Sequence, residues 1–246
     1  MTVPTPVLSF VIPIWQEGEN ITAVLTALAQ ATDLSRHEIL AVYDRDDDNT
    51  LPVLARLAPQ FPALRPVKNA HGVGARRAVI TGFEVARGGG VCVVMADLSD
   101  DLALLPRMEA MLRDGIDLVS PSRYMPGGRQ IGGPWLKRVL SRLAGITLHS
   151  LAALPTHDPT NNFKLYRRSM LAAIPIGLEG GFELALEITV KSWRAGYRVV
   201  ELPATWRDRT AGQSRFRFWS WLPRYLGWYL LAFFPGRRGP GAGGRA

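Results

Sequence analysis

Short apolar runs alternate with helix-patterned segments through the first half of the chain, and this order constrains the fold more than any other feature. The runs that we predict to be strands cover residues 7–14, 38–43, 64–67, 91–96 and 117–122. Apolar residues at helical spacing fill the segments between them, at residues 21–28, 51–58, 75–86 and 103–113. This alternation favours an α/β fold, in which a mostly parallel sheet carries helices on both faces.

Acidic residues follow three of these predicted strands. They are Glu17 and Glu19 after the first, Asp44, Asp46, Asp47 and Asp48 after the second, and Asp97, Asp100 and Asp101 after the fourth. The carboxyl ends of parallel strands form one edge of a sheet, where ligands bind, so we expect these acids to converge there. One acidic turn would be an ordinary solvated loop, but three such turns indicate a site for a cation, a sugar, or both.

A divalent cation would relieve the repulsion between clustered carboxylates. Oxygen ligands of this kind suit Mg²⁺ or Mn²⁺, and a nucleotide diphosphate would complete the coordination shell. The metal would then neutralise charge on the departing diphosphate. An alternative stays open for Asp100 and Asp101, which would instead cap the helix that begins near Ala103.

The composition of the chain narrows its class. Its 246 residues are 47% hydrophobic, which is enough for a substantial core. The single cysteine, Cys92, excludes an internal disulfide framework, and the N-terminus shows no signal-peptide pattern. Residues 1–190 carry 18 Lys/Arg against 19 Asp/Glu, whereas residues 191–246 carry 11 against 2. This basic last quarter suits phosphates or anionic lipid, and without zinc-ligand spacing or an RNA-binding motif we expect no nucleic-acid partner.

The glycines at positions 72 and 74 do not form a nucleotide-binding fingerprint. The stretch HGVGARRA lacks the third glycine of the dinucleotide motif and the Gly-Lys-Ser/Thr of a P-loop. We interpret it as a turn before a helix.

Seven ordered segments of the chain match the motifs of one known family. They are SFVIPIWQEGENI, AVYDRDDDNT, GVGARRAVITGFEVARGGGVCVVMADLSDD, SPSRYMPGG, DPTNNFKLYRR, GFELALEITVKSWRAGYRVVELPATW and RDRTAGQSRF. Over roughly residues 7–218 the chain resembles the family 2 glycosyltransferases with a GT-A fold, and among them the dolichyl- or polyprenyl-phosphate mannose synthases. The resemblance implies a Rossmann-like, mostly parallel sheet flanked by helices, in a GT-A domain over residues 1–217.

The resemblance also implies a nucleotide site at the strand ends. Pro13 and Glu17 match the first-strand segment that borders the nucleotide, and Asp44 matches the aspartate that contacts the base. Ala96 matches a position beside the sugar-nucleotide. The residues on either side of Asp44 depart from the family's pattern, so the preferred base stays open.

The metal site is implied in the same way. Asp97 matches the last aspartate of the family's Asp-x-Asp motif, and Ser99 matches a further residue of the metal shell. Met95 stands in place of the first motif aspartate, so one usual ligand is missing. Asp100 or Asp101 is expected to compensate, or Asp97 and the diphosphate hold the Mg²⁺ or Mn²⁺ between them.

Four arginines complete the catalytic set that Asp97 begins. Arg123 and Arg138 match arginines near the phosphates or the lipid-phosphate acceptor. Arg209 and Arg215 match basic residues of the late Arg-x-x-x-Gly-x-Ser-Lys pattern, with arginine where lysine is usual. The alternative for Arg138, together with Arg142, is a place on one solvated polar face of a helix.

The chemistry depends on the acceptor. A lipid phosphate is already anionic near neutral pH, so positioning matters more than a strong base. A sugar hydroxyl would need a general base, for which Asp158 is a candidate. The alternative for Asp158, which lies in the sequence HDPT, is a turn or cap residue, because Asp-Pro favours turns.

The C-terminal segment raises the question of a membrane. Residues 218–234, FWSWLPRYLGWYLLAFF, are amphipathic and aromatic, but the uninterrupted apolar part is too short to span a bilayer. We expect either a peripheral contact at the cytoplasmic face of a membrane or a helix packed on the core. Residues 134–153 form another amphipathic segment, and residues 235–246 are predicted to be a disordered tail.

The leading hypothesis is an inverting glycosyltransferase that moves a hexose from a nucleotide-sugar to a polyprenyl phosphate. By resemblance, mannose from GDP-mannose is the favoured donor and UDP-glucose is next. Two alternatives stay open: a transferase acting on a saccharide acceptor, and a non-catalytic protein that binds a sugar-nucleotide.

Overall fold

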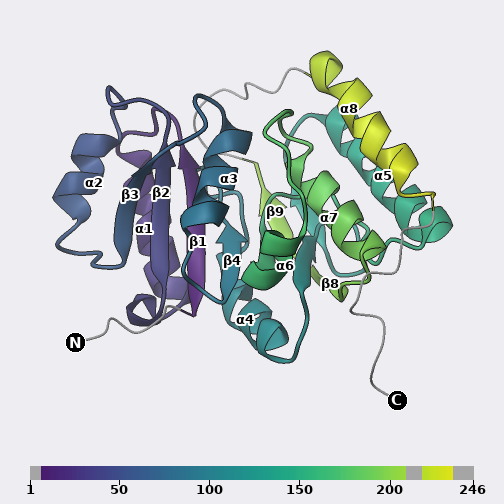
Figure 1. Cartoon of the computed structure of the whole chain (residues 1–246), viewed down its shortest axis with the longest axis horizontal. Helices are drawn as coiled ribbons and strands as arrows, with labels where there is room; N and C mark the ends of the chain where they lie inside the picture. The colour runs from purple at the N-terminus through teal and green to yellow at the C-terminus, as the bar shows by residue number, and fades with distance from the viewer. Residues whose placement is uncertain (1–6, 209–217, 235–246) are drawn as a thin grey trace.

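The computed structural model describes residues 7–208 and 218–234, and its centre is a seven-stranded sheet (Figure 1). The strands lie in the order β3-β2-β1-β4-β7-β5-β8. Their bounds are β1 Leu8–Ile14, β2 Glu38–Tyr43, β3 Leu64–Lys68, β4 Gly90–Val93, β5 Leu118–Ser122, β7 Lys164–Arg167 and β8 Val199–Pro203. Strand β7 is antiparallel to both of its neighbours, and the other pairs are parallel. The predicted mostly parallel α/β sheet is confirmed.

Helices cover both faces of the sheet, because strand residues alternate between two cores. Phe10, Ile12 and Ile39 face one core, to which α1, α2 and α4 contribute, and Val11 and Leu40 face the other, to which α3, α6 and α7 contribute. The helices span α1 Asn20–Ala31, α2 Leu51–Leu57, α3 Ala75–Val85, α4 Leu105–Arg113, α5 Trp135–Ala152, α6 Arg168–Ala173, α7 Leu184–Arg194 and α8 Phe218–Leu231.

The fourth predicted strand is shorter than its apolar run. Strand β4 ends at Val93, and after one further backbone bond from Val94 the chain leaves the sheet. The amide of Met95 then donates to the Asp100 carboxylate instead of to a neighbouring strand. The helix expected from residue 103 begins as a 3₁₀ turn, Leu102–Leu104, that leads into α4.

A second, two-stranded sheet lies against the loop that follows β4. It pairs β6 (Arg129–Ile131) with β9 (Thr205–Arg207) in parallel. The amide of Thr205 donates to the Asp101 carboxylate at 3.0 Å, and that of Arg207 donates to the Ser99 carbonyl at 3.2 Å. Asp101 makes no side-chain cap on the turn that follows it, so the capping alternative is wrong for this residue.

Helix α8 packs beside α5 and α7, at the end of the molecule opposite α2 (Figure 1). Tyr225, Trp228 and Tyr229 contribute to this contact, and the Tyr229 hydroxyl donates to Thr147 of α5 at 2.9 Å. In the described part of the chain, no helix combines the length and the hydropathy that a bilayer crossing requires. The packed-helix alternative thus describes one side of α8. The tail predicted to be disordered, residues 235–246, lies outside the described residues.

The contact between α3 and β1 depends on a glycine. A Cβ on Gly82 would lie 2.3 Å from Val11 Cγ1, so Gly82→Ala forces helix and strand apart. We expect the free energy of unfolding to fall by about 2 kcal/mol, as for other overpacked cores. Urea denaturation measures this loss. Gly177→Ala is the control, because a Cβ there meets nothing within 4 Å, and equal stability of the two variants would contradict the prediction.

Candidate active site

The carboxyl ends of β1, β2 and β4 meet at one edge of the sheet, because β1 pairs in parallel with both of the others. Pro13 is the penultimate residue of β1 and pairs with Val42 of β2. Glu17 lies in the loop after β1, Asp44 directly follows β2, and Asp97 lies in the loop after β4. The structure therefore brings the predicted donor-site residues to a common edge, and their roles there stay predictions.

Asp48, one of the acids after β2, holds the loop that follows β1. The buried Asp48 accepts a hydrogen bond from the Gln16 amide at 2.9 Å, and Thr50 accepts one from the Glu17 amide at 3.0 Å. Gln16 has a φ of 56°, which a residue with a side chain adopts only when its surroundings hold it there. Asp48 thus shapes the loop that carries Glu17.

Asp44 holds the turn before α3. Its carboxylate accepts hydrogen bonds from Asn69 Nδ2 at 2.7 Å and from the Gly74 amide at 2.9 Å. Gly74 precedes α3 with a φ of 135°, a conformation that favours glycine. The interpretation of this segment as a turn before a helix is confirmed, and its anchor is a predicted nucleotide-binding residue.

The loop after β4 presents Asp97 and turns Asp100 inward. Asp97 Oδ1 accepts a hydrogen bond from the Ser99 amide at 3.1 Å, and Leu98 between them has a φ of 57°. Asp100 Oδ2 accepts from the Met95 amide at 2.8 Å. Burial raises the pKa of Asp100 to about 7, and the Asp97 carboxylate acts in the same direction. Ala96 and Ser99 are buried in the same loop.

The residues at this edge fit a cation that shares its ligands with a diphosphate. Among the described residues, no three His, Cys, Asp or Glu side chains group closely enough to form a complete protein cage. Mg²⁺ is usually held by one or two carboxylates together with substrate phosphates, so such a cage is not required. Asp97 is the residue that would hold the ion, and Ser99 and Asp100 stay predicted members of its shell.

Arg123 is held in one orientation by a buried carboxylate. Its Nε and Nη2 donate to the two Asp158 oxygens at 2.6 and 2.8 Å, and its amide donates to Oδ2 at 3.1 Å. Although burial opposes the charged form, the Arg123 guanidinium lowers the pKa of Asp158 below its usual value. Asp158 therefore orients Arg123 and stays ionised, an arrangement that does not favour a general base.

Lys164 supports this pair from a strand of the sheet. It lies in β7, fully buried, and its Nζ donates to Ser120 Oγ at 2.5 Å and to the Asp158 carbonyl at 3.0 Å. Burial lowers the pKa of Lys164 to about 7, against the opposing charge of Asp158. The sequence analysis did not single out Lys164, although a lysine between apolar residues in FKLY is a signal of a buried partner.

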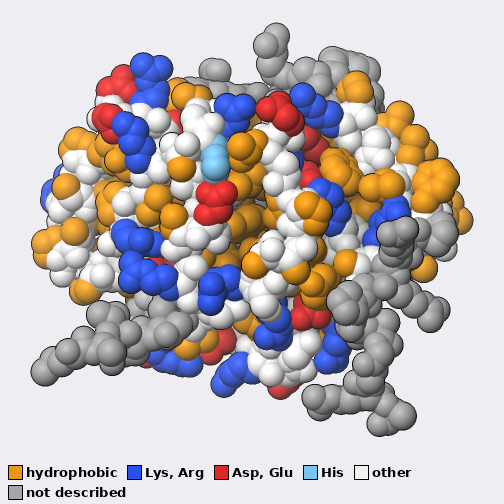
Figure 2. All heavy atoms as spheres, in the orientation of Figure 1, with side chains coloured by type: hydrophobic (Ala, Val, Ile, Leu, Met, Phe, Trp, Pro, Cys, Tyr) orange, Lys and Arg blue, Asp and Glu red, His pale blue; other side chains and the backbone are white. Residues whose placement is uncertain are grey.

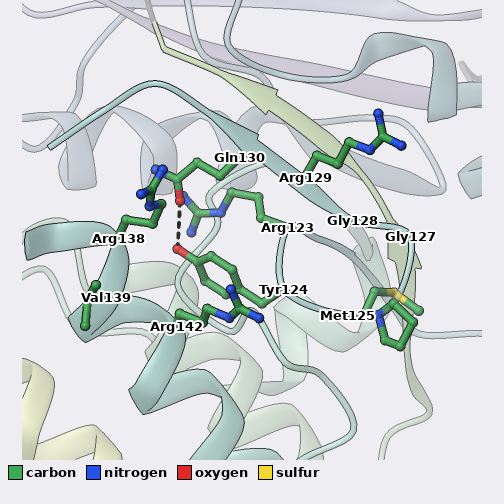
Figure 3. A pocket seen from close by; sticks show the side chains of 11 residues that line it. Arg123, Tyr124, Met125, Gly127, Gly128, Arg129, Gln130, Arg138, Val139 and Arg142 are labelled. Carbon is green, nitrogen blue, oxygen red and sulfur yellow. Dashed lines mark hydrogen bonds between the residues drawn. The ribbon is translucent and has the colours of Figure 1, made fainter. Parts of the chain in front are cut away.

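Next to Arg123 lies a cavity of about 600 Å³, which we call the arginine cavity (Figure 3). It is lined by Arg123, Tyr124, Met125, Pro126, Gly127, Gly128, Arg129, Gln130, Arg138, Val139 and Arg142. Arg123, Arg138 and Arg142 gather around Tyr124, whereas Arg129 points away from them (Figure 3). Among the described residues, no carboxylate forms an ion pair with Arg138 or Arg142. This excess of positive charge suits an anion.

The predicted arginines are placed to different extents. Arg123 and Arg138 line the same cavity, and their roles stay predictions, whereas Arg209 and Arg215 lie outside the described residues. Arg142 was treated only as part of a polar helix face, although its spacing of four from Arg138 puts both on one side of α5. Asp100 interacts electrostatically with both Arg123 and Asp97. Because Arg123 lines the arginine cavity, the cavity adjoins the acidic edge of the sheet.

The comparisons with known proteins agree with this arrangement. The family model described as glycosyl transferase family 2 matches residues 9–174. Polyprenol monophosphomannose synthase of Mycolicibacterium smegmatis is 30% identical over 86% of this chain and 82% of its own length. Undecaprenyl-phosphate mannosyltransferase of Micrococcus luteus is 30% identical over 83% of this chain and 85% of its own length. Dolichol-phosphate mannosyltransferase of Pyrococcus furiosus is 27% identical over 85% of this chain, which spans only 59% of that protein.

Solved structures show the same fold at lower identity. Glucosyl-3-phosphoglycerate synthase from Mycobacterium tuberculosis, in complex with Mn²⁺, uridine diphosphate and glucosyl-3-phosphoglycerate, superposes with a TM-score of 0.68 at 17% identity, over 92% of this chain and 80% of that one. TarS of S. aureus superposes with a TM-score of 0.60 at 20% identity, over 81% and 60%.

The chain thus has the GT-A fold, as the resemblance implied. It belongs to glycosyl transferase family 2 and is a glycosyltransferase.

The lowered pKa of Lys164 makes stability depend on pH in a defined window. Between about 7 and the ordinary value of 10.5, the unfolded chain binds a proton at Lys164 that the folded chain does not. The free energy of unfolding therefore rises with pH across this window. Lys164→Met removes the effect, so chemical denaturation should show the wild type gaining stability relative to the variant as the pH rises. A difference that stays constant with pH would mean that Lys164 titrates normally.

Proposed function

We propose that this chain is an inverting glycosyltransferase that moves a hexose, with mannose favoured over glucose, from a nucleotide-sugar to a polyprenyl phosphate. The observation that carries the proposal is the arginine cavity beside the acidic edge of the sheet. The acidic edge suits a metal-bound diphosphate, and the cavity suits a second anion. Two adjacent sites of this kind are what transfer from a diphosphate donor to a phosphate acceptor needs.

The acceptor side supplies a nucleophile that is already ionised. A phosphate oxygen held by Arg123, Arg138 and Arg142 attacks the anomeric carbon and forms the new C–O bond. The bond from that carbon to the donor's diphosphate breaks, and the nucleoside diphosphate leaves with the electron pair. Attack from the opposite face inverts the anomeric centre. Because Asp158 is engaged by Arg123, the site favours a phosphate over a saccharide hydroxyl, which would need a base.

The donor side binds the nucleotide and orients its diphosphate. Pro13, Glu17, Asp44 and Ala96 border the nucleotide in this proposal, at the edge where β1, β2 and β4 end. Asp97 would hold Mg²⁺ or Mn²⁺, which when bound neutralises charge on the leaving diphosphate. Mannose is favoured because the three relatives are named as mannosyltransferases or a mannose synthase.

A screen of nucleotide-sugars against polyprenyl phosphate tests this function. We expect GDP-mannose, and with lower efficiency UDP-glucose, to yield a glycosyl phospholipid that mass spectrometry identifies. Asp97→Ala should lower the transfer rate at least about 100-fold, because the leaving diphosphate loses its metal-mediated stabilisation. Asp114→Ala is the control, since Asp114 is an exposed acid after α4.

The outcomes separate the alternatives. Transfer to soluble glycans without lipid phosphate would instead establish a saccharide acceptor. Tight donor binding with no turnover on any acceptor would establish a non-catalytic sugar-nucleotide-binding protein, the alternative that Met95 keeps open. Full activity of Asp97→Ala would remove the role assigned to Asp97.

The proposal also places the protein peripherally at the cytoplasmic face of a membrane. Helices α5 and α8 expose large apolar side chains: Trp135, Leu136, Val139, Leu140, Leu143, Leu151, Leu226 and Leu230, continued by Phe233 and Phe234. Hydrophobic side chains are exposed at the right-hand edge of Figure 2, where α5 and α8 lie in Figure 1. Arg138 and Arg142 flank this apolar surface, as in helices that lie on anionic bilayers.

Single serine substitutions on this surface test the membrane contact. Leu143 of α5 and Leu230 of α8 are 55% and 51% exposed, so Leu143→Ser and Leu230→Ser should leave the fold intact. We expect each to lower partition onto phosphatidylglycerol vesicles about fivefold, because one leucine less enters the bilayer. Vesicle sedimentation measures this. Leu178→Ser is the matched control, an exposed leucine outside both helices, and equal binding of all three variants would contradict the contact.

A further inference from the structure

The hydroxyl of Tyr124 joins the three segments that carry the arginines of the arginine cavity. Tyr124 lies in the loop after β5, and its hydroxyl donates to Gln130 Oε1 of β6 at 3.1 Å (Figure 3). The same hydroxyl lies 2.9 Å from Ser141 Oγ of α5. We propose that Tyr124 is a positioning residue, which fixes α5 so that Arg138 and Arg142 act together with Arg123 on the acceptor's phosphate.

The N-terminal half of α5 has little else to hold it in place. Of the described side chains from Trp135 to Leu143, none is buried, and Ser141 is the one that is not exposed. The second half is fixed differently. Gly145 packs directly on the His157 carbonyl, and Leu148 is buried in the core that α5 shares with α7. Position in the first half therefore depends on the hydrogen bonds of Ser141.

Those hydrogen bonds lead back to Arg123 by two routes. The Ser141 hydroxyl lies 3.2 Å from Thr160 Oγ1, which in turn lies 3.4 Å from Arg123 Nη2 and 3.3 Å from Asp158 Oδ1. On the other side, the Arg123 guanidinium lies 4.8 Å from the centre of the Tyr124 ring, a cation–π contact. Arg123 and the arginine-bearing helix are thus connected through Tyr124 and through Thr160.

This connection matters because arginine side chains are long and the first half of α5, which carries them, is otherwise exposed. A phosphate bound by arginines from two segments loses affinity when the segments drift relative to each other, since binding must then also order them. The inference rests on the proposed acceptor. It goes beyond it by assigning the coupling to the hydroxyls of Tyr124 and Ser141, and Ser141 itself lies outside the lining of the cavity.

The test compares Tyr124→Phe and Ser141→Ala with farnesyl phosphate as a soluble acceptor. Tyr124→Phe keeps the ring beside Arg123 and removes only the hydroxyl. We expect each variant to raise the acceptor KM about fivefold, the effect of losing about one net hydrogen bond, with kcat and donor KM unchanged within about twofold. The double variant should resemble Ser141→Ala, because the contact between Tyr124 and Ser141 is already lost in that variant.

The matched control is Tyr229→Phe. It removes a tyrosine hydroxyl bond to the same helix, to Thr147, in the half that is fixed by packing. We expect its acceptor KM to equal that of the wild type. An equal rise in Tyr229→Phe would show general loosening of α5 and overturn the inference. A rise in Tyr124→Phe without one in Ser141→Ala would make Tyr124 a direct ligand and overturn it as well.

Calorimetry of farnesyl phosphate binding in the absence of donor separates this inference from the proposed function. If the wild type transfers no sugar, the proposed reaction fails, but about fivefold weaker binding to both variants still supports positioning by Tyr124. If the wild type transfers sugar and both variants bind farnesyl phosphate as tightly as it does, the positioning role fails alone.

Discussion

The buried ion pair between Arg123 and Asp158 is the constraint on which the site depends. A charged carboxylate with no exposure is stable only with a partner that satisfies both oxygens, and Arg123 does this with two side-chain bonds and its own amide. Lys164 holds the Asp158 backbone from β7. The end of β5 and the chain before β7 are therefore locked together, and Arg123 enters the cavity already oriented. A phosphate bound there meets a cation whose conformational entropy has been removed by folding.

The fold separates two kinds of chemistry along one edge. The half of the sheet built from β3, β2, β1 and β4 is parallel and ends in carboxylates. Beyond the antiparallel β7, the arginines come from the loop after β5, from β6 of the second sheet and from α5. The loop after β4 is the boundary, because its Asp100 interacts electrostatically with both Asp97 and Arg123. An acidic half next to a basic half is the electrostatic division that the proposed transfer between two phosphorylated partners needs.

The sequence predicted the first half of this arrangement well and the second half poorly, for physical reasons. Apolar strands in β-α order imply a parallel sheet, so the acids after β1, β2 and β4 had to share an edge. Strand β7 breaks this rule because it pairs antiparallel with its neighbours. Its buried Lys164 interrupts the apolar run, so the sequence pattern does not identify it as a buried strand. The arginine cavity is formed by segments distant along the chain, so Arg142 looked like solvated surface. The connection from Tyr124 to Ser141 is set by tertiary packing alone and leaves no local signal.

The exposed first half of α5 has a consequence for how a lipid would be recognised. Its arginines face the cavity, while its tryptophan and leucines face outward. Where that outer surface rests on a bilayer, the position of the helix fixes the distance between the cavity and the acyl layer. Only the anionic end of an isoprenoid then contacts the protein, and its repeating units stay in the membrane. The protein therefore does not sense how many units the chain has. The enzyme would then select a lipid by the charge of its head group and by how far that group extends from the bilayer. Lipids with isoprenoid chains of very different length would be equally good acceptors.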